Sequence, residues 1–307
     1  MTEKLPSYSA GSTYQIIDLM PDFWEFHAKS RDADVLEQAN LFKTMIADKH
    51  PEVYAAKVIG LDANKPYDEA LVERYRLCHE RSTAQQIKTM RRISDSITSN
   101  LSQYESKFRE NFPDFNYTGS VYFMNSLLGF DGATRLVNGK ISLLFGLDTM
   151  AWVYGEDLDL QPFFHHEIFH IYHSQFLEED SDDVASAVWH EGLAQFVAKS
   201  LNPSAEGVNL FGLPQDMPQR SEAMLSVLAG KLLEVLDSTS RDDYGKFFFG
   251  NNGDAEIPPR SGYYVSYQVV QKIAQKRSLQ EMVHSKLAAI KPEIREALKE
   301  LAHAKRE

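Results

Sequence analysis

The chain contains almost no cysteine. Among its 307 residues only Cys78 carries a thiol, so a disulfide within the chain is excluded and a packed core has to hold the fold. Cys78 lies among helix-forming residues, and nothing near it suggests the paired histidine that a cysteine nucleophile needs. We therefore expect a buried structural thiol.

Long apolar runs are also missing. No run approaches the ~20 residues that cross a bilayer, and residues 1–13 are polar, without the apolar centre of a signal peptide. We therefore expect no membrane span and, by default, a cytoplasmic protein. A periplasmic or secreted protein is expected instead if a signal peptide has been removed. Nothing in the sequence specifies an oligomeric state.

Basic residues are fewer than acidic ones. The chain has 32 lysines and arginines against 44 aspartates and glutamates, which gives a net charge of -12. Binding to nucleic acid requires clustered Lys and Arg, so nucleic acid is excluded as a general partner. Hydrophobic residues make up 43% of the chain, which is enough for a sizeable core.

Proline and glycine are absent from residues 69–80 and 82–112, and both ranges are predicted as helices. In the second range, apolar residues recur at steps of three or four, which is typical of one buried helix face. Pro113 ends this helix. The residues of the stripe are Ile87, Met90, Ile93, Ile97, Leu101, Tyr104, Phe108 and Phe112.

The sequence changes character after residue 115. Residues 120–124 are apolar and aromatic, and Asn138-Gly139 separates two further apolar runs, residues 135–137 and 141–145. Asn-Gly between apolar runs is a strong hairpin signal. We therefore predict a small antiparallel sheet between about residues 119 and 147.

Helices return from Gln161 onward. Another helix is predicted from Val184 to Leu201, capped by one of residues 181–183. Residues 212–220 and 238–261 are polar and rich in Gly, Pro and Asn, and are predicted as loops. A further helix begins near Ser261, and Pro292 interrupts the C-terminal helical tail. The predicted fold class is α+β and predominantly helical.

Residues 166–170 form the motif His-Glu-x-x-His. His166 and His170 lie one turn apart on one face of a helix, so both can bind a single metal ion. Glu167 is offset by one residue and can act as a base toward a water molecule. Apolar residues surround the histidines on almost every side, and buried His and Glu are costly unless they are paired or bind something.

A catalytic zinc site needs a third protein ligand and one open position. Glu191 shares the apolar face of the helix 184–201 with Val188 and Ala194. The segment between His170 and Glu191 is long enough for this helix to turn back toward the helix that carries the two histidines. We therefore predict one Zn²⁺ per chain, bound by His166, His170 and Glu191. His165, His173 and His190 are expected to pack around the site.

These residues carry a family resemblance. His166-Glu167-x-x-His170 followed by Glu191-Gly192-Leu193-Ala194 resembles the gluzincin metallopeptidases. More closely, the chain resembles a group of bacterial zinc-dependent proteases catalogued as a domain of unknown function, over about residues 115–290. Those proteins carry a later Gly-Tyr-x-x-Gly-Tyr helix, which is present here as residues 262–267, with Ser266 in place of the second glycine.

The resemblance implies a zinc peptidase acting on a peptide or protein substrate, with Glu167 as general base. Tyr263 is the first candidate and Tyr267 the second for holding the oxyanion. It also implies a sheet or hairpin beside a zincin-type pair of active-site helices. The expected domains are a helical N-terminal region, residues 1–115, packed on a zincin-like catalytic domain, residues 116–307, with a helical C-terminal tail.

The chain departs from this pattern in two places. It lacks the Gly-x-Met-Glu-Asn segment with which aminopeptidase gluzincins anchor a free amino terminus, which favours an endopeptidase. Four residues after His170, where the thermolysin-like branch has an aspartate, the chain has Ser174.

Three alternatives remain open. Di-iron carboxylate proteins use two Glu-x-x-His motifs, and residues 167–170 and 281–284 match that pattern formally, although the hairpin and the adjacent His166 fit it poorly. The zinc could instead be held by a non-catalytic binding protein. Finally, the site could hydrolyse amides or esters that are not peptides.

Overall fold

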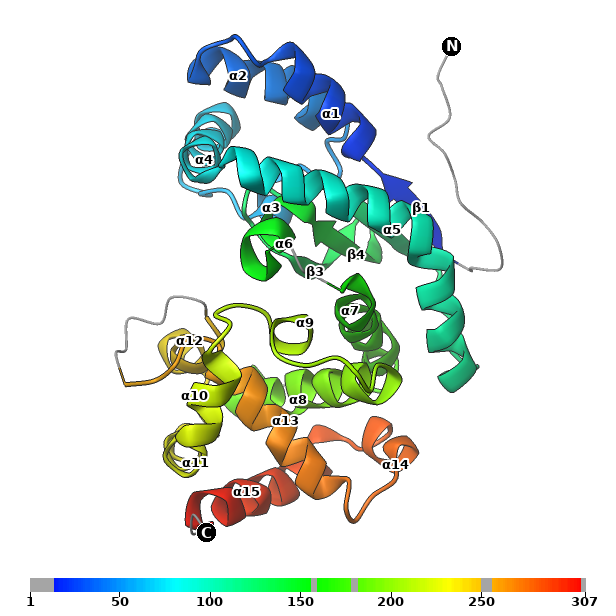
Figure 1. The fold of residues 1–307 in the computed structure, drawn as a ribbon, viewed down its shortest axis with the longest axis vertical. Coiled ribbons are helices and arrows are strands. Elements are labelled where there is room, and N and C mark those ends of the chain that lie inside the picture. The colour runs from blue at the N-terminus through cyan, green and yellow to red at the C-terminus, as the bar shows by residue number, and fades with distance from the viewer. Residues whose placement is uncertain (1–13, 156–158, 178–181, 250–255, 305–307) are drawn as a thin grey trace. The chain divides into compact units, whose positions relative to one another are not determined.

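The computed structural model describes residues 14–155, 159–177, 182–249 and 256–304 (Figure 1). The chain divides into two compact units, residues 1–157 and residues 158–307. The sheet lies in the first unit, and the helix pair with the His-Glu-x-x-His motif and Glu191 lies in the second. The domain boundary at residues 115/116 stays a prediction.

The first unit combines a sheet with helices. Its elements are β1 (Gln15–Asp18), α1 (Met20–Lys29), α2 (Val35–Phe42), η1 (Lys43–Ala47), α3 (Ala56–Ile59), α4 (Tyr67–Arg81), α5 (Ala84–Asn111), β2 (Ser120–Met124), β3 (Gly132–Val137), β4 (Lys140–Gly146) and α6 (Leu147–Tyr154). Together with the helical second unit, they confirm the predicted α+β, predominantly helical class.

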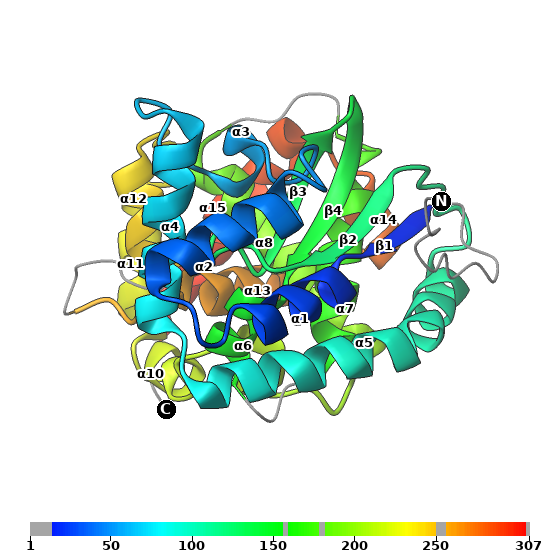
Figure 2. The same ribbon diagram turned by 90° about the horizontal axis from the view of Figure 1, so that it is seen from above.

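Among the described residues, four strands form one sheet in the order β1-β2-β4-β3, and Figure 2 shows them side by side. The strands β3 and β4 are antiparallel, as predicted, but β2 pairs in parallel with both β1 and β4. The sheet is therefore mixed, and the prediction of an antiparallel sheet was wrong in this respect. After β2 the chain first forms the outer strand β3. The hairpin then places β4 between β3 and β2, and β4 runs parallel to β2.

The hairpin turn follows from its two central residues. Asn138 and Gly139 have φ angles of 49° and 77°, which are the positive values of a type I′ turn. The two long helices were also predicted correctly. The capping box of Thr83 and Gln86 begins α5, and the apolar stripe of this helix is buried except for the half-buried Ile87. Cys78, on α4, is buried as expected.

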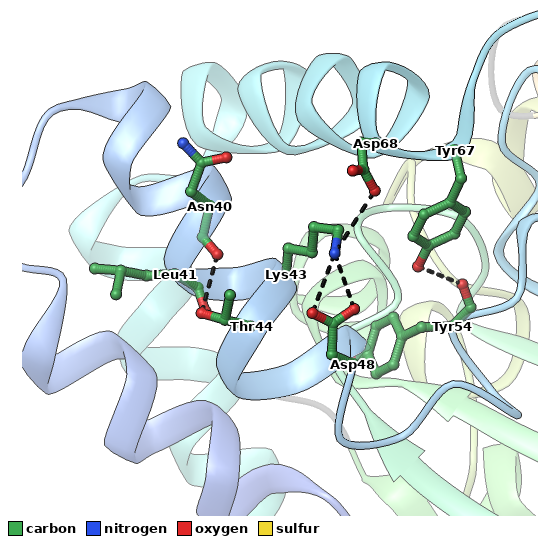
Figure 3. Close-up of polar contacts among 8 residues, drawn as sticks. All are labelled: Asn40, Leu41, Lys43, Thr44, Asp48, Tyr54, Tyr67 and Asp68. Carbon is green, nitrogen blue, oxygen red and sulfur yellow. Dashed lines mark hydrogen bonds and ion pairs between the residues drawn. The ribbon is translucent and has the colours of Figure 1, made fainter.

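A π-helical turn, η1, continues α2 and is tied to α4 by side chains (Figure 3). The Lys43 ammonium lies 3.1 Å from Asp48 and 3.6 Å from Asp68, the first acidic residue of α4. Asp68 is exposed, so this ion pair adds little to stability. The Tyr67 hydroxyl donates a hydrogen bond of 2.9 Å to the backbone oxygen of the buried Tyr54, which holds the start of α4 against the loop after η1.

The second unit consists of helices in its described part. They are α7 (Leu160–Ser174), α8 (Val184–Leu201), α9 (Val208–Phe211), α10 (Met217–Ala223), α11 (Leu225–Glu234), α12 (Arg241–Phe248), α13 (Ser261–Ile273), α14 (Leu279–Val283) and α15 (Leu287–His303). Helix α8 packs against α7, α13 and α15, and Figure 1 shows α13 crossing α8 toward α15. Within the described residues, no helix is both long and apolar enough to cross a membrane.

Three predictions for this unit were wrong. Residues 217–220, predicted as part of a loop, form the start of α10, with Pro218 in its first turn. Residues 241–248, predicted as a loop, form α12, because the Ser240 hydroxyl caps the amides of Asp242 and Asp243. Pro292 does not interrupt the C-terminal helix but lies inside α15. A proline in a helix interior costs about 3 kcal/mol. The buried stripe of α15, which includes Ile290, Ile294 and Leu298, continues on both sides of it and offsets that cost.

Candidate metal centre

Helix α7 carries the His-Glu-x-x-His motif. The Asp159 carboxylate accepts a hydrogen bond of 3.0 Å from the amide of Gln161 and so begins the helix, with Pro162 in its first turn. Phe164, Ile168 and most other residues of α7 are buried, as expected for a helix that is apolar on nearly all sides. The helix that carries the motif is therefore largely buried within the unit, while Glu167 and His170 stay partly exposed.

Helix α8 carries Glu191 and has the predicted bounds. The Asp183 carboxylate accepts a hydrogen bond of 2.9 Å from the amide of Ser186, which identifies Asp183 as the cap. Gly192, next to Glu191, lies directly against α13. A methyl group at this position would come within 2.5 Å of the backbone oxygen of Ser266. Because Gly192 has no side chain, α13 can pack directly against α8 beside Glu191.

The three predicted ligands come together. The Nε2 atoms of His166 and His170 are 3.0 Å apart, and the Oε2 atom of Glu191 lies 3.2 Å from the first and 3.5 Å from the second. A metal ion could be held by a group of three or more His, Cys, Asp or Glu residues with converging ligand atoms. Within the described part of the chain, the group of this kind is His166, His170 and Glu191. The side chains of His170 and Glu191 are 23% and 20% exposed, so the cluster can be reached from solvent.

The charges of the cluster favour a cation. Burial by itself raises the pKa of Glu191, but the two histidines outweigh it, and the net pKa lies far below the usual range. Burial by itself lowers the pKa of His170, but Glu191 and then Glu167 outweigh it, and the net pKa is raised. The effect on His170 also indicates that the Glu167 carboxylate lies near the cluster.

These residues fit a zinc ion. The donor atoms are two imidazole nitrogens and one carboxylate oxygen, which is a known three-residue set for catalytic zinc. Two imidazole nitrogens that face each other at 3.0 Å beside a carboxylate also need a proton or a cation between them. The geometry and the chemistry of the donors therefore agree, while the role of the three residues as ligands stays a prediction.

The other histidines of this region contact neighbouring side chains, and their expected packing around the site stays a prediction. The amide of Asn202 donates a hydrogen bond of 2.9 Å to Nδ1 of the fully buried His165. His173 is buried, stacks on Phe169 at 5.5 Å and meets the ring of His190 at 5.4 Å. Burial, followed by the neighbouring histidines, lowers the pKa of His173 to about 3, so this ring is neutral near pH 7.

Tyr263 and Tyr267 both lie on α13, as predicted. Tyr263 is half-buried, with its ring 5.5 Å from that of Phe248 and the Arg260 guanidinium 4.6 Å above it. Tyr267 is buried against Phe211, and its hydroxyl accepts a hydrogen bond of 2.8 Å from Gln271. The assignment of an oxyanion donor to either tyrosine stays a prediction.

Sequence reasoning missed Tyr244, which lies on α12. Burial and then the negative charge of Glu191 raise the pKa of its hydroxyl to about 12, so Tyr244 lies within electrostatic reach of the proposed ligand. The signal was present in Ser240-Arg-Asp-Asp, a helix start, but the glycines and asparagines that follow led to the prediction of a loop.

Glu281, from the di-iron alternative, and Ser174, from the departure after His170, both form local hydrogen bonds. Glu281 closes the capping box of α14 by accepting hydrogen bonds of 2.8 and 2.7 Å from the amide and hydroxyl of Ser278. It is therefore not free to complete a di-iron site. The Ser174 hydroxyl donates to the backbone oxygen of Ile171 at 2.8 Å, within its own helix.

A comparison with known protein families identifies the family to which the chain belongs. A family model described as predicted Zn-dependent protease (DUF2268) matches residues 138–291, which is half of the chain. The chain belongs to this family, and the predicted resemblance to zinc proteases of unknown function is confirmed. A search of the curated proteins and a search of the solved structures found no match.

Proposed function

We propose that the protein is a zinc metallopeptidase of the gluzincin type, with endopeptidase activity favoured over aminopeptidase activity. The observation that carries this proposal is the convergence of His166, His170 and Glu191 from two buried helices, with ligand atoms within 4.8 Å of one another. The family description, a predicted Zn-dependent protease, supports zinc as the metal and proteolysis as the activity.

The chain's own residues supply the remaining chemistry. A zinc ion, when bound, polarises the scissile carbonyl and makes water more acidic. Glu167 follows His166 on α7, is half-buried, and lies close enough to raise the pKa of His170. We assign to it the transfer of a proton from the attacking water to the leaving amine.

The developing oxyanion needs a hydrogen-bond donor. We retain Tyr263 as the first candidate and Tyr267 as the second, and add Tyr244. Burial and then the charge of Glu191 raise the pKa of the Tyr244 hydroxyl, and this interaction with a proposed ligand supports its addition. The Tyr267 hydroxyl accepts a hydrogen bond from Gln271, so its own proton is left to donate and would have to point toward the substrate.

The metal content of the purified protein tests the site. We expect about one zinc per chain in the wild type, because three protein ligands and water complete a tetrahedral site. Glu191→Ala should lose it. The control is Glu234→Gln, which changes an exposed glutamate on α11 and should keep the metal. Zinc retained by Glu191→Ala would remove Glu191 from the ligand set.

The reaction is tested separately, with a peptide library and detection of products by mass spectrometry. Glu167→Gln should keep zinc but lower turnover by about 10²–10⁴. A protein that holds zinc but cleaves no peptide would favour a non-catalytic zinc protein. Cleavage of simple esters or amides alone would favour a hydrolase of non-peptide substrates.

A further inference from the structure

The first unit contains a cavity of about 290 Å³ that is lined only by residues of that unit. Its size is close to the lower end of small-molecule sites in proteins. The proposed peptidase chemistry uses none of its residues.

The cavity lies at the carboxyl ends of parallel strands. The strands β1, β2 and β4 run in one direction, and Asp18 pairs with Phe123 while Met124 pairs with Gly146. The segments that follow these strand ends supply part of the lining, through Phe23, Leu127 and Asp148. In open sheets with parallel strands, ligands bind at this edge because the loops there converge.

One wall of the cavity is aromatic. Phe26 and Phe42 meet edge to face at 5.4 Å, and Tyr75 lies 5.6 Å from Phe42. All three are buried, and the Tyr75 hydroxyl is held by a hydrogen bond to Gln38 at 3.1 Å. This wall is rigid and suits a flat or extended apolar body.

A strained loop forms another part of the lining, through Leu127 and Leu128. Leu127 and Leu128 both have φ near +54°, a region that costs a leucine about 1 kcal/mol or more. The Asp148 carboxylate holds the loop there by accepting hydrogen bonds of 2.6 Å from the amides of Ser126 and Leu128. Strained backbone that the surroundings fix in this way is typical of ligand-binding sites.

Two exposed arginines, Arg31 and Arg81, bring positive charge to the lining of the cavity. The lining also contains His27 and His79. Among the described residues, neither arginine forms an ion pair, although the whole chain has an excess of acidic residues. The acidic residue of the lining, Asp148, is already engaged by backbone amides.

We propose that this cavity binds a small carboxylate with an aromatic or short acyl body. The body lies against Phe26, Phe42 and Tyr75, and the carboxylate pairs with Arg31 and Arg81. Arginine suits this task because its planar guanidinium binds a carboxylate with two hydrogen bonds. The proposal does not depend on the proposed peptidase activity.

Isothermal titration of the full chain tests the proposal with matched probe pairs: 2-naphthoate against 2-naphthalenemethanol, and octanoate against octanol. We expect at least one carboxylate to bind with one molecule per chain, about tenfold or more tighter than its neutral alcohol. Arg31→Gln with Arg81→Gln should remove this preference. Arg76→Gln, which changes an exposed arginine of α4 outside the cavity lining, should leave it unchanged.

A second variant tests the position of the site. Ile87 is half-buried and lines the cavity, so Ile87→Trp should fill it and weaken binding by about tenfold or more while circular dichroism stays native. The proposal is overturned if no carboxylate binds at millimolar concentration, if alcohol and carboxylate bind equally, or if the double arginine variant binds like the wild type.

Discussion

Gly192 of α8 lies so close to Ser266 of α13 that a Cβ atom on the glycine would be 2.5 Å from the serine's backbone oxygen and 2.8 Å from its carbonyl carbon. Side-chain atoms do not approach backbone this closely. The two helices therefore cross at a point where the residue of α8 must be a glycine, and this residue directly follows Glu191 in the chain. The fully buried Ser266 is itself small, which keeps the crossing tight from the other side.

Gly192→Ala should force these helices apart. We expect a loss of about 1–3 kcal/mol in the free energy of unfolding, as for other overpacked sites, and weaker zinc binding because Glu191 moves with α8. Urea unfolding and competition with a chromophoric chelator measure the two effects. Gly230→Ala is the matched control, since nothing lies within 4 Å of a Cβ at that helical position. Unchanged stability and zinc affinity in Gly192→Ala would contradict the tight crossing.

The proposed role of the α13 tyrosines in catalysis is tested by removing their hydroxyls. We expect Tyr263→Phe to lower kcat by about 10²–10³, the cost of losing an oxyanion donor, with zinc content unchanged. Tyr267→Phe should have a smaller effect, because Tyr267 is more deeply buried than Tyr263 and packs against Phe211. Unchanged turnover in Tyr263→Phe would remove Tyr263 from the mechanism.

Tyr244 offers a separate test on α12. Its pKa of about 12 keeps the hydroxyl protonated, and so able to donate, through the whole neutral and mildly alkaline range. Tyr244→Phe should therefore lower kcat at every pH from 6 to 10 without changing the shape of the profile. Zinc content and circular dichroism serve as controls. A variant with normal kcat would show that Tyr244 only packs near Glu191.

His173 makes stability depend on pH. Its pKa is about 3 in the folded protein and about 6.5 in an unfolded chain. The unfolded chain therefore binds the proton first, and stability falls as the pH drops below about 6.5, by up to about 1.4 kcal/mol per pH unit. His173→Phe keeps the stacking on Phe169 and should flatten this slope in urea unfolding with the metal chelated. Equal slopes in variant and wild type would contradict the low pKa.

Asp183 stabilises the start of α8 in two ways. Its carboxylate accepts a hydrogen bond from Ser186 and lies 2.7 Å from the Lys291 ammonium. Asp183→Ala should cost about 1–2 kcal/mol by urea unfolding, since it removes the cap. Asp183→Asn keeps a capping oxygen, and Lys291 keeps Asp237 at 2.7 Å, so the loss should be smaller. Equal losses in the two variants would mean that the ion pair matters more than the cap.

Local patterns predicted much of this structure. The bounds of α8, the long helix α5 and the β3–β4 hairpin depend on caps, apolar periodicity and an Asn-Gly turn, which are encoded by neighbouring residues. The grouping of His166, His170 and Glu191 could be predicted because helix geometry fixes the histidine pair and an apolar face reveals the glutamate.

The rest depends on contacts between distant segments. Strand β1 has only the four residues Gln15–Asp18, too few to show a clear alternation, and its pairing with β2 joins segments separated by six helical elements. The position of Tyr244 near Glu191 likewise depends on how α12 packs. The cavity beside Leu127 and Asp148 requires a backbone conformation that leucine rarely adopts, so no sequence pattern predicts it.

The three proposed ligands lie on two consecutive helices, between residues 166 and 191. Bringing them together closes only a short loop, and the entropy lost in closing a loop grows with its length. The metal centre therefore requires few of the long-range contacts that slow folding. A metal ion held by the three proposed ligands would join α7 to α8 without help from α13, which contacts α8 through Ser266 and lies much farther along the chain.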